Sequence, residues 1–361
     1  MVTITLVVVF LASVILTPLV RKFAFAIGAV DNPNKRRVNK KPMPTLGGLA
    51  IILSFLIGFV MLPIDLSSFW PILVGGLIVT LVGVFDDRFE LTAGMKLFGQ
   101  FLASSVVVFG GNLMINYITL PLIGQINFGW FAGPFTIIWI IAIMNAINLV
   151  DGLDGLAGGI SSIVLISIAA MAYVLNDFIV FPISMVLVAA ILGFLIYNFH
   201  PASIFMGDTG ALFLGYMIGV LSVMGFKNVT FISLIIPIMI LGVPFSDTFF
   251  AIIRRVSQKK SISEADHSHL HHRLLALGFT HRQTVILIYA LSAMFALGGF
   301  IFFISSFVGS IFLLILLLLS LEILVEFIGW ISPEYRPIIR FFQQRMAKIT
   351  AYRKQRRGRN K

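Results

Sequence analysis

Long apolar runs dominate this sequence and are its strongest constraint on folding. Hydrophobic residues make up 59% of the 361 residues and charged residues only 11%, against roughly 45–50% and about 25% in soluble domains. A soluble fold of this length has too little interior to bury so much apolar surface. The absence of Cys also excludes a disulfide scaffold and a thiolate site. The chain is therefore expected to be an all-α polytopic membrane protein.

The apolar runs predict how often the chain crosses the membrane. A hydrocarbon core about 30 Å thick is crossed by about 20 helical residues. Eleven runs are suitable, near residues 3–20, 45–62, 70–85, 97–110, 131–148, 159–175, 179–196, 210–225, 230–252, 283–304 and 308–329. The basic residues of the first run, Arg21 and Lys22, follow its apolar stretch, so we expect an anchor and not a cleavable signal peptide.

The distribution of positive charge predicts the orientation. With eleven crossings, 25 of the 26 Lys and Arg residues fall on one side and only Lys227 falls on the other. The positive-inside rule assigns the basic side to the cytoplasm. The N-terminus is then outside and the C-terminus is inside. Because topology explains the net charge of +11, no nucleic-acid partner is expected.

The chain is expected to form one transmembrane domain over residues 1–330, followed by a basic tail over 331–361. Its cytoplasmic loops are predicted over 28–44, 86–96, 149–158, 198–209 and 253–282.

In the tail, Ile338, Phe342 and Met346 recur at a spacing of four residues between basic residues. This pattern is typical of an amphipathic helix on anionic inner-leaflet lipid, and a solvated tail is the alternative. Residues 112–129 favour a small external β-hairpin, with an irregular loop as the alternative.

The acidic residues are unevenly distributed between the two sides of the membrane. Only Asp65 and Asp177 fall in outer loops, and most of the others lie on or near inner loops. The segments 145–159 and 198–215 contain no Lys or Arg. An acid at a membrane border without a local cation usually needs a metal ion or a substrate as its partner.

Two acidic pairs are candidates for such a site. Asp86 and Asp87 are adjacent, so they suit a divalent cation or a state with one acid protonated. In the alternative interpretation they form a helix end neutralised by Arg88. Asp151 and Asp154 are three residues apart and could share a helical face, whereas the alternative is a turn between two spans.

Asp208 precedes a predicted span and is expected to be a metal ligand or a helix cap. All-oxygen ligands favour Mg²⁺, with Mn²⁺ as a variant. Asp247 and the Glu322/Glu326 pair are interpreted as structural charges, with Arg254 as the partner of Asp247.

A histidine-rich segment lies in the predicted loop 253–282. His269, His271 and His272 stand beside Arg273 and are expected to bind an anionic substrate such as a pyrophosphate. A zinc site and a solvated loop are the alternatives. An acidic, magnesium-type site at the inner face suits phosphoryl transfer between a soluble donor and a lipid acceptor.

Five stretches in order give the chain a family resemblance. They are DNPNKRRVNKKPMPTLGG (31–48), GVFDDR (83–88), NAINLVDGLDGLAGG (145–159), NFHPASIFMGDTG (198–210) and ADHSHLHHRLLALGF (265–279). On these motifs the chain resembles the polyprenyl-phosphate N-acetylhexosamine-1-phosphate transferases, which form glycosyltransferase family 4. The histidine motif is similar to that of the branch using UDP-GlcNAc. The whole chain is similar to the Gram-positive enzymes that begin wall teichoic acid synthesis, and related surface-glycan enzymes share the motifs.

The resemblance implies transfer of GlcNAc-1-phosphate from UDP-GlcNAc to undecaprenyl phosphate at the inner membrane face, with release of UMP. It implies that Asp208 and Asp87 bind Mg²⁺. The implied catalytic acids are Asp86, Asp87, Asp151 and Asp154. The implied substrate-binding residues are Lys40, Lys41, Asn145, Asn148, His269, His271, His272 and Arg273. A homodimer is compatible with the sequence but not specified by it.

Three other functions are considered. A phospho-MurNAc-pentapeptide transferase is the alternative within the family. A cation-coupled secondary transporter would place its acids near the midplane, often in inverted repeats, and this sequence has neither feature. A non-catalytic lipid-binding scaffold leaves the two acidic segments without lysine or arginine unexplained.

Overall fold

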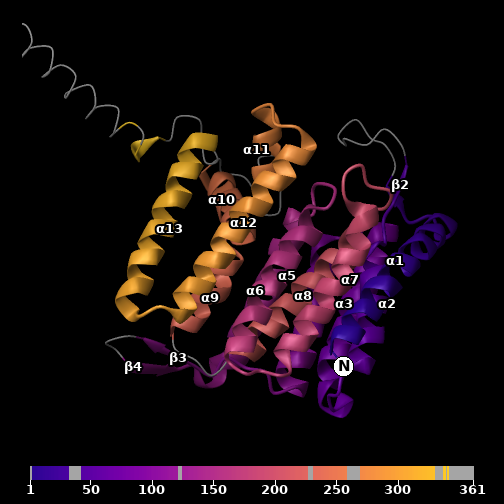
Figure 1. Cartoon of the computed structure of the whole chain (residues 1–361), viewed down its shortest axis with the longest axis horizontal. Coiled ribbons are helices and arrows are strands. Elements are labelled where there is room, and N and C mark those ends of the chain that lie inside the picture. Colours follow the sequence, from indigo (N-terminus) through magenta and orange to yellow (C-terminus); the bar gives the residue numbers. More distant parts are fainter. Residues whose placement is uncertain are drawn as a thin grey trace, which may run out of the picture.

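A computed structural model of the chain shows a bundle of long helices with two small strand pairs (Figure 1). The structure describes residues 2–31, 42–120, 124–226, 231–257, 269–329, 336–338 and 340. Within these ranges, nine helical segments are long and apolar enough to cross a membrane. The predicted class, an all-α polytopic membrane protein, is confirmed.

The nine segments include most of the long helices. These are α1 (Val2–Ile27), α3 (Trp70–Phe89), α4 (Ala93–Ser105), α5 (Ala132–Val150), α6 (Leu156–Val174), α7 (Val180–Asn198), α8 (Gly207–Phe226), α12 (His281–Ile304) and α13 (Phe307–Ile328). Short turns extend three of them: η1 (Leu66–Phe69) before α3, η2 (Val106–Gly110) after α4, and η3 (Gly129–Phe131) before α5.

The other two predicted spans are shorter or broken helices. Helix α2 (Gly48–Met61) has 14 residues, which gives a length of about 21 Å. The prediction of one continuous helix over 230–252 is wrong, because α9 (Phe231–Ile240) ends before α10 (Gly242–Ser257) begins. Pro237, which has no amide hydrogen, and the permissive Gly242 flank this break. The count of eleven crossings stays a prediction.

Helix α8 occupies the centre of the bundle. It is the most buried of the nine candidate spans, whereas α1 and α13 are the least buried. Helices α3 and α5 both pack along it. A Cβ atom at Gly83 of α3 would lie 2.4 Å from the Cα atom of Thr209, so only glycine allows α3 to approach the start of α8 this closely.

The two strand pairs lie at opposite ends of the bundle. Strands β1 (Val30–Asp31) and β2 (Met43–Pro44) pair at the end that carries the short helix α11 (Leu270–Ala276). Strands β3 (Tyr117–Leu120) and β4 (Gly124–Asn127) pair antiparallel at the other end, within the segment for which a hairpin was predicted (Figure 1). That this hairpin faces the outside stays a prediction.

Near the C-terminus, the predicted amphipathic tail falls almost wholly outside the described residues. The backbone amide of Ile338 donates a hydrogen bond of 2.6 Å to the carboxylate of Glu326. Glu326 is fully buried, so this contact is consistent with its predicted structural role.

Candidate active site

Acidic residues from three separate sequence segments meet around the start of α8. Asp86 and Asp87 lie in the last turn of α3, and the left-handed conformation of Glu90 (φ 52°) turns the chain into α4. Helix α5 leads into Asp151, and Asp208 lies in the first turn of α8. The expectation that distant acidic motifs share one site is consistent with this geometry.

A lysine of α4 lies between two of these acids. The Nζ atom of Lys96 is 2.6 Å from Oδ2 of Asp208 and 2.5 Å from Oδ2 of Asp86. The alternative in which Arg88 neutralises the aspartate pair is wrong, because the Arg88 guanidinium lies over the Phe89 ring, 5.2 Å from its centroid. The sequence placed Lys96 among the inner basic residues but gave no signal of its contact with Asp208, which is 112 residues away.

Asp87 caps helix α8 from a neighbouring helix. Its Oδ1 accepts a hydrogen bond from the Asp208 amide at 2.9 Å. Its Oδ2 accepts from the Thr209 amide at 3.1 Å and from the Thr209 hydroxyl at 2.6 Å. These bonds satisfy amides that every helix leaves free at its start, and the helix dipole favours the negative charge there. The cap that was considered for Asp208 is therefore supplied by Asp87.

Because Asp87 provides the cap, the side chain of Asp208 can point into the acidic cluster. Its Oδ1 accepts a hydrogen bond from Nδ2 of Asn148 at 3.1 Å, while its Oδ2 faces Lys96. Asn148, a predicted substrate-binding residue, thus orients the predicted metal ligand.

The cluster carries more negative charge than its lysine can balance. Asp86, Asp87, Asp151 and Asp208 bring four carboxylates to one ammonium group. Burial raises the pKa of Asp151 to about 8, with further contributions from the charges of Asp208, Asp87 and Asp154. A carboxyl group with this pKa marks a site short of positive charge. Closely spaced oxygen donors with excess negative charge fit a hard divalent cation such as Mg²⁺.

Asn145 lies about one turn before Asn148 in α5 and makes different contacts. Its Nδ2 donates to Oε1 of the buried Gln100 at 2.8 Å and to the carbonyl of Ile141 at 2.9 Å. The structure thus places this predicted substrate-binding residue in a hydrogen bond between α4 and α5.

Asp151 and Asp154 do not share a helical face, because residues 151–155 form turns between α5 and α6. The backbone is thus the turn of the alternative interpretation, and a ligand-binding role for the two acids stays a prediction. Oδ2 of Asp154 lies 2.7 Å from Nδ1 of His200 and accepts from the Ala202 amide at 3.1 Å. Asp154 thereby fixes the loop that leads into α8.

His281 completes a group of three potential metal ligands with Asp154 and His200. The two imidazole rings are stacked, with centroids 4.2 Å apart and planes at 21°. A metal ion lies near the plane of each imidazole that binds it, so two stacked rings do not direct their nitrogens at one ion. We interpret the group as a structural support, in which Asp154 and His200 share a hydrogen bond and His281 stacks on His200. The sequence gave no signal for His281.

The histidine-rich segment reaches the acidic turn through α11. A Cβ atom at Gly152 would lie 2.5 Å from Nε2 of His271, so glycine is needed for this close approach. Burial lowers the pKa of His271 to about 3, helped by the neighbouring His272. His271 is therefore neutral near pH 7 and acts through hydrogen bonding and shape. The permanent positive charge of this segment is Arg273, in the last turn of α11.

The remaining predicted site residues lie elsewhere. His269 begins α11 and its Nδ1 lies 3.0 Å from Oδ2 of Asp247. Lys40 and Lys41 lie outside the described residues. The described backbone that follows them is tied to the site, because the Phe205 amide donates to the carbonyl of Pro44 at 2.9 Å.

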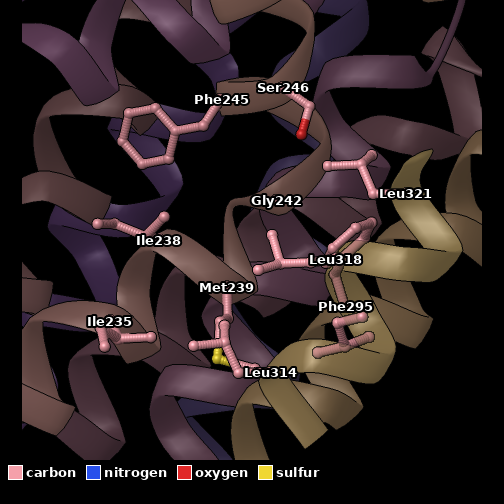
Figure 2. A pocket seen from close by; sticks show the side chains of 11 residues that line it. Ile235, Ile238, Met239, Gly242, Phe245, Ser246, Phe295, Leu314, Leu318 and Leu321 are labelled. Atoms are coloured by element: carbon pink, nitrogen blue, oxygen red, sulfur yellow. The ribbon is translucent and has the colours of Figure 1, made fainter. Parts of the chain in front are cut away.

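An apolar cavity of about 270 Å³ lies between α9, α10, α12 and α13. Figure 2 shows Met239 and Leu314 within this lining, and Ser246 is the one polar side chain among the eleven residues that form it. Leu318, which also lines the cavity, is 56% exposed, so the cavity reaches the surface of the bundle. Its chemistry suits a hydrocarbon chain and not a charged group.

Comparison with known proteins gives consistent matches. The sequence pattern described as "Glycosyl transferase family 4" matches residues 69–226, which run from η1 to the end of α8. The chain is 41% identical to a "Probable undecaprenyl-phosphate N-acetylglucosaminyl 1-phosphate transferase" of Bacillus subtilis, over 95% of this chain and 96% of that protein.

Two further relatives are more distant. A "Decaprenyl-phosphate N-acetylglucosaminephosphotransferase" of Mycobacterium tuberculosis is 34% identical over 78% of this chain and 77% of its own. A "Phospho-N-acetylmuramoyl-pentapeptide-transferase" of Halalkalibacterium halodurans is 33% identical over 81% of this chain and 94% of its own.

Proposed function

The chain belongs to glycosyl transferase family 4, and from that premise we propose that it is a polyprenyl-phosphate GlcNAc-1-phosphate transferase. Its donor is UDP-GlcNAc, its acceptor is undecaprenyl phosphate, and its active site faces the cytoplasm. The observation that carries the proposal is the group of four carboxylates and Lys96 at the start of α8. The physiological role that fits best is the first step of wall teichoic acid synthesis or of a related surface glycan.

The proposed reaction is a direct displacement at phosphorus. An oxygen of the lipid phosphate attacks the β-phosphorus of UDP-GlcNAc and forms the new P–O bond. The bond from the β-phosphorus to the bridging oxygen breaks, and UMP leaves with the electron pair. The products are UMP and undecaprenyl-pyrophosphoryl-GlcNAc.

The acidic cluster is proposed to hold Mg²⁺, with Mn²⁺ as a substitute. Asp208 and Asp151 are the best-placed ligands, and Oδ1 of Asp87 keeps one lone pair beside its single hydrogen bond. When bound, the ion neutralises phosphate charge as it develops on the leaving group. Asn148 holds the Asp208 carboxylate in orientation through its amide.

The chain's other groups have separate roles in this proposal. Lys96 balances Asp86 and Asp208, so that two acids and an anionic substrate can occupy one region. Asp86 is proposed to contact the phosphate of the lipid acceptor. Arg273 provides the fixed charge for the donor's phosphates, and neutral His271 provides a hydrogen bond.

The polyprenyl chain is proposed to use the apolar cavity beside α10. Its lining is almost wholly apolar, and the helices that form it lie on one flank of the bundle (Figure 1). A chain of isoprene units entering there is shielded from water, while its phosphate extends toward the acidic cluster.

The deciding experiment measures UMP release by detergent-purified protein with undecaprenyl phosphate and Mg²⁺. UDP-GlcNAc and UDP-MurNAc-pentapeptide are supplied in separate reactions, with and without EDTA. Asp208→Asn tests the site, and Asp65→Asn is the matched control, because Asp65 is an exposed acid that caps η1.

We expect UMP from UDP-GlcNAc only, lost with EDTA and in Asp208→Asn but not in Asp65→Asn. Release from the muramyl donor instead would assign the chain to the other branch. Folded protein that releases no UMP from either donor would refute the transferase proposal and favour a transporter.

A further inference from the structure

Asp247 is a buried acid that holds the first residues of the histidine helix. It lies in α10 and is 2% exposed. Its Oδ2 is 3.0 Å from Nδ1 of His269, and its Oδ1 accepts the Leu270 amide at 2.9 Å. One carboxylate thus binds both the ring of His269 and the backbone at the start of α11.

From these contacts we propose that Asp247 is a positioning residue that sets the ring orientation and tautomer of His269. An ionised carboxylate accepts hydrogen bonds and cannot donate them. In the neutral form of the ring, the proton is therefore held on Nδ1 and Nε2 keeps its lone pair. Asp–His pairs elsewhere in proteins fix the working nitrogen of a histidine in this way.

The same contacts determine where α11 meets the acidic cluster. The rings of His269 and His271 are parallel within 3°, with centroids 6.0 Å apart. His271 in turn lies against Gly152, the residue after Asp151. Fixing the start of α11 therefore fixes the position of its histidines relative to the acids.

Replacement of Asp247 by Asn is expected to change the tautomer of His269 while keeping the fold. The amide has nearly the same shape, and its oxygen can still accept the Leu270 amide. Its NH₂ group then faces Nδ1 of His269 and must donate to it, which moves the ring proton to Nε2. This consequence rests on the structure alone, whereas its effect on catalysis rests on the proposed function.

The first test is spectroscopic and needs no activity. The chain contains six histidines, so ¹⁵N-histidine labelling after removal of any histidine tag gives a short set of ring signals. The signal lost in His269→Gln identifies His269. We expect protonated Nδ1 in the wild type and protonated Nε2 in Asp247→Asn. An unchanged tautomer in Asp247→Asn would overturn the proposal.

The second test is a double-mutant cycle on UMP release. Asp247→Asn should lower kcat about 10–100-fold, the usual range for a residue that orients another, with little change in KM for the lipid. In a His269→Gln background the same substitution should have almost no further effect. Full additivity of the two losses would refute action through His269.

Thr248→Val is the matched control on the same helix. Its hydroxyl donates to the carbonyl of Pro244 within α10 and not to α11, so kcat should stay near that of the wild type. If no variant and no wild-type protein releases UMP, the proposed function fails while the tautomer measurement still decides the role of Asp247.

Discussion

Asp87→Asn distinguishes a helix cap from a catalytic acid. Asp87 accepts three hydrogen bonds from the first turn of α8, one at Oδ1 and two at Oδ2. In the variant, one side-chain atom becomes an NH₂ group that cannot accept. Either one or two of these bonds is then lost, and a donor is placed against a donor.

The structure sets the size of the effect. Hydrogen bonds to charged groups contribute about 1.5–3 kcal/mol each, and a buried donor left without a partner costs about 1–3 kcal/mol. We therefore expect Asp87→Asn to lower the free energy of unfolding by about 3 kcal/mol. Asp208→Asn should change stability far less, because it removes the repulsion with neighbouring acids along with the contact to Lys96.

Thermal unfolding followed by the intrinsic fluorescence of the four Trp residues measures this difference. Thiol-reactive dyes are unsuitable because the chain has no Cys. Both variants should lose UMP release, but only Asp87→Asn should also melt at a lower temperature. Asp87→Asn with wild-type stability and no activity would refute the capping argument and leave Asp87 only its role as a direct ligand of metal or substrate.

Three further predictions follow from the same geometry. Lys96→Met should lower the free energy of unfolding in EDTA by about 2–3 kcal/mol. This is somewhat under the usual cost of breaking a buried ion pair, because Lys96 is 29% exposed. Saturating Mg²⁺ should reduce the difference in stability between variant and wild type, and a difference that does not respond to Mg²⁺ would contradict a shared cation site. Since Asp151 has a pKa of about 8 in the folded chain and about 3.9 when unfolded, the folded state binds the extra proton between these values. Stability in EDTA should thus fall as pH rises from about 4 to 8, and thermal scans should show a larger stabilisation by Mg²⁺ at pH 8 than at pH 6; equal stabilisation at both would count against this reasoning. Met239→Phe, which fills part of the apolar cavity, should raise KM for undecaprenyl phosphate several-fold with KM for UDP-GlcNAc unchanged, and the reverse pattern would place the lipid elsewhere.

The sequence was sufficient to identify most of the acidic residues of the site but not the contacts between them. The motifs containing Asp86, Asp151 and Asp208 were recognisable because acidic residues stood beside glycines in apolar surroundings. The contacts between these residues could not be predicted, because such contacts depend on which helix ends lie together. Lys96 illustrates the limit, since nothing near it in the sequence indicates that it faces Asp208 across the bundle.

The break between α9 and α10 shows a similar limit at the level of the fold. Apolarity over 230–252 was sufficient to predict a span, because hydropathy depends on composition alone. The end of α9 at Ile240 depends on backbone geometry near Pro237 and on packing, since a Cβ atom at Gly242 would lie 2.5 Å from the Phe295 ring.

The sequence by itself determined that this chain is a helical membrane protein with acidic motifs, because apolar runs and charge patterns are local properties. Only the tertiary structure decided the role of each acid. Asp87 caps α8, Asp154 supports a loop, and Asp247 holds a histidine helix. The physical reason is that a carboxylate's role is set by the donors and charges within a few ångströms, and here those come from residues 22 to 122 positions away.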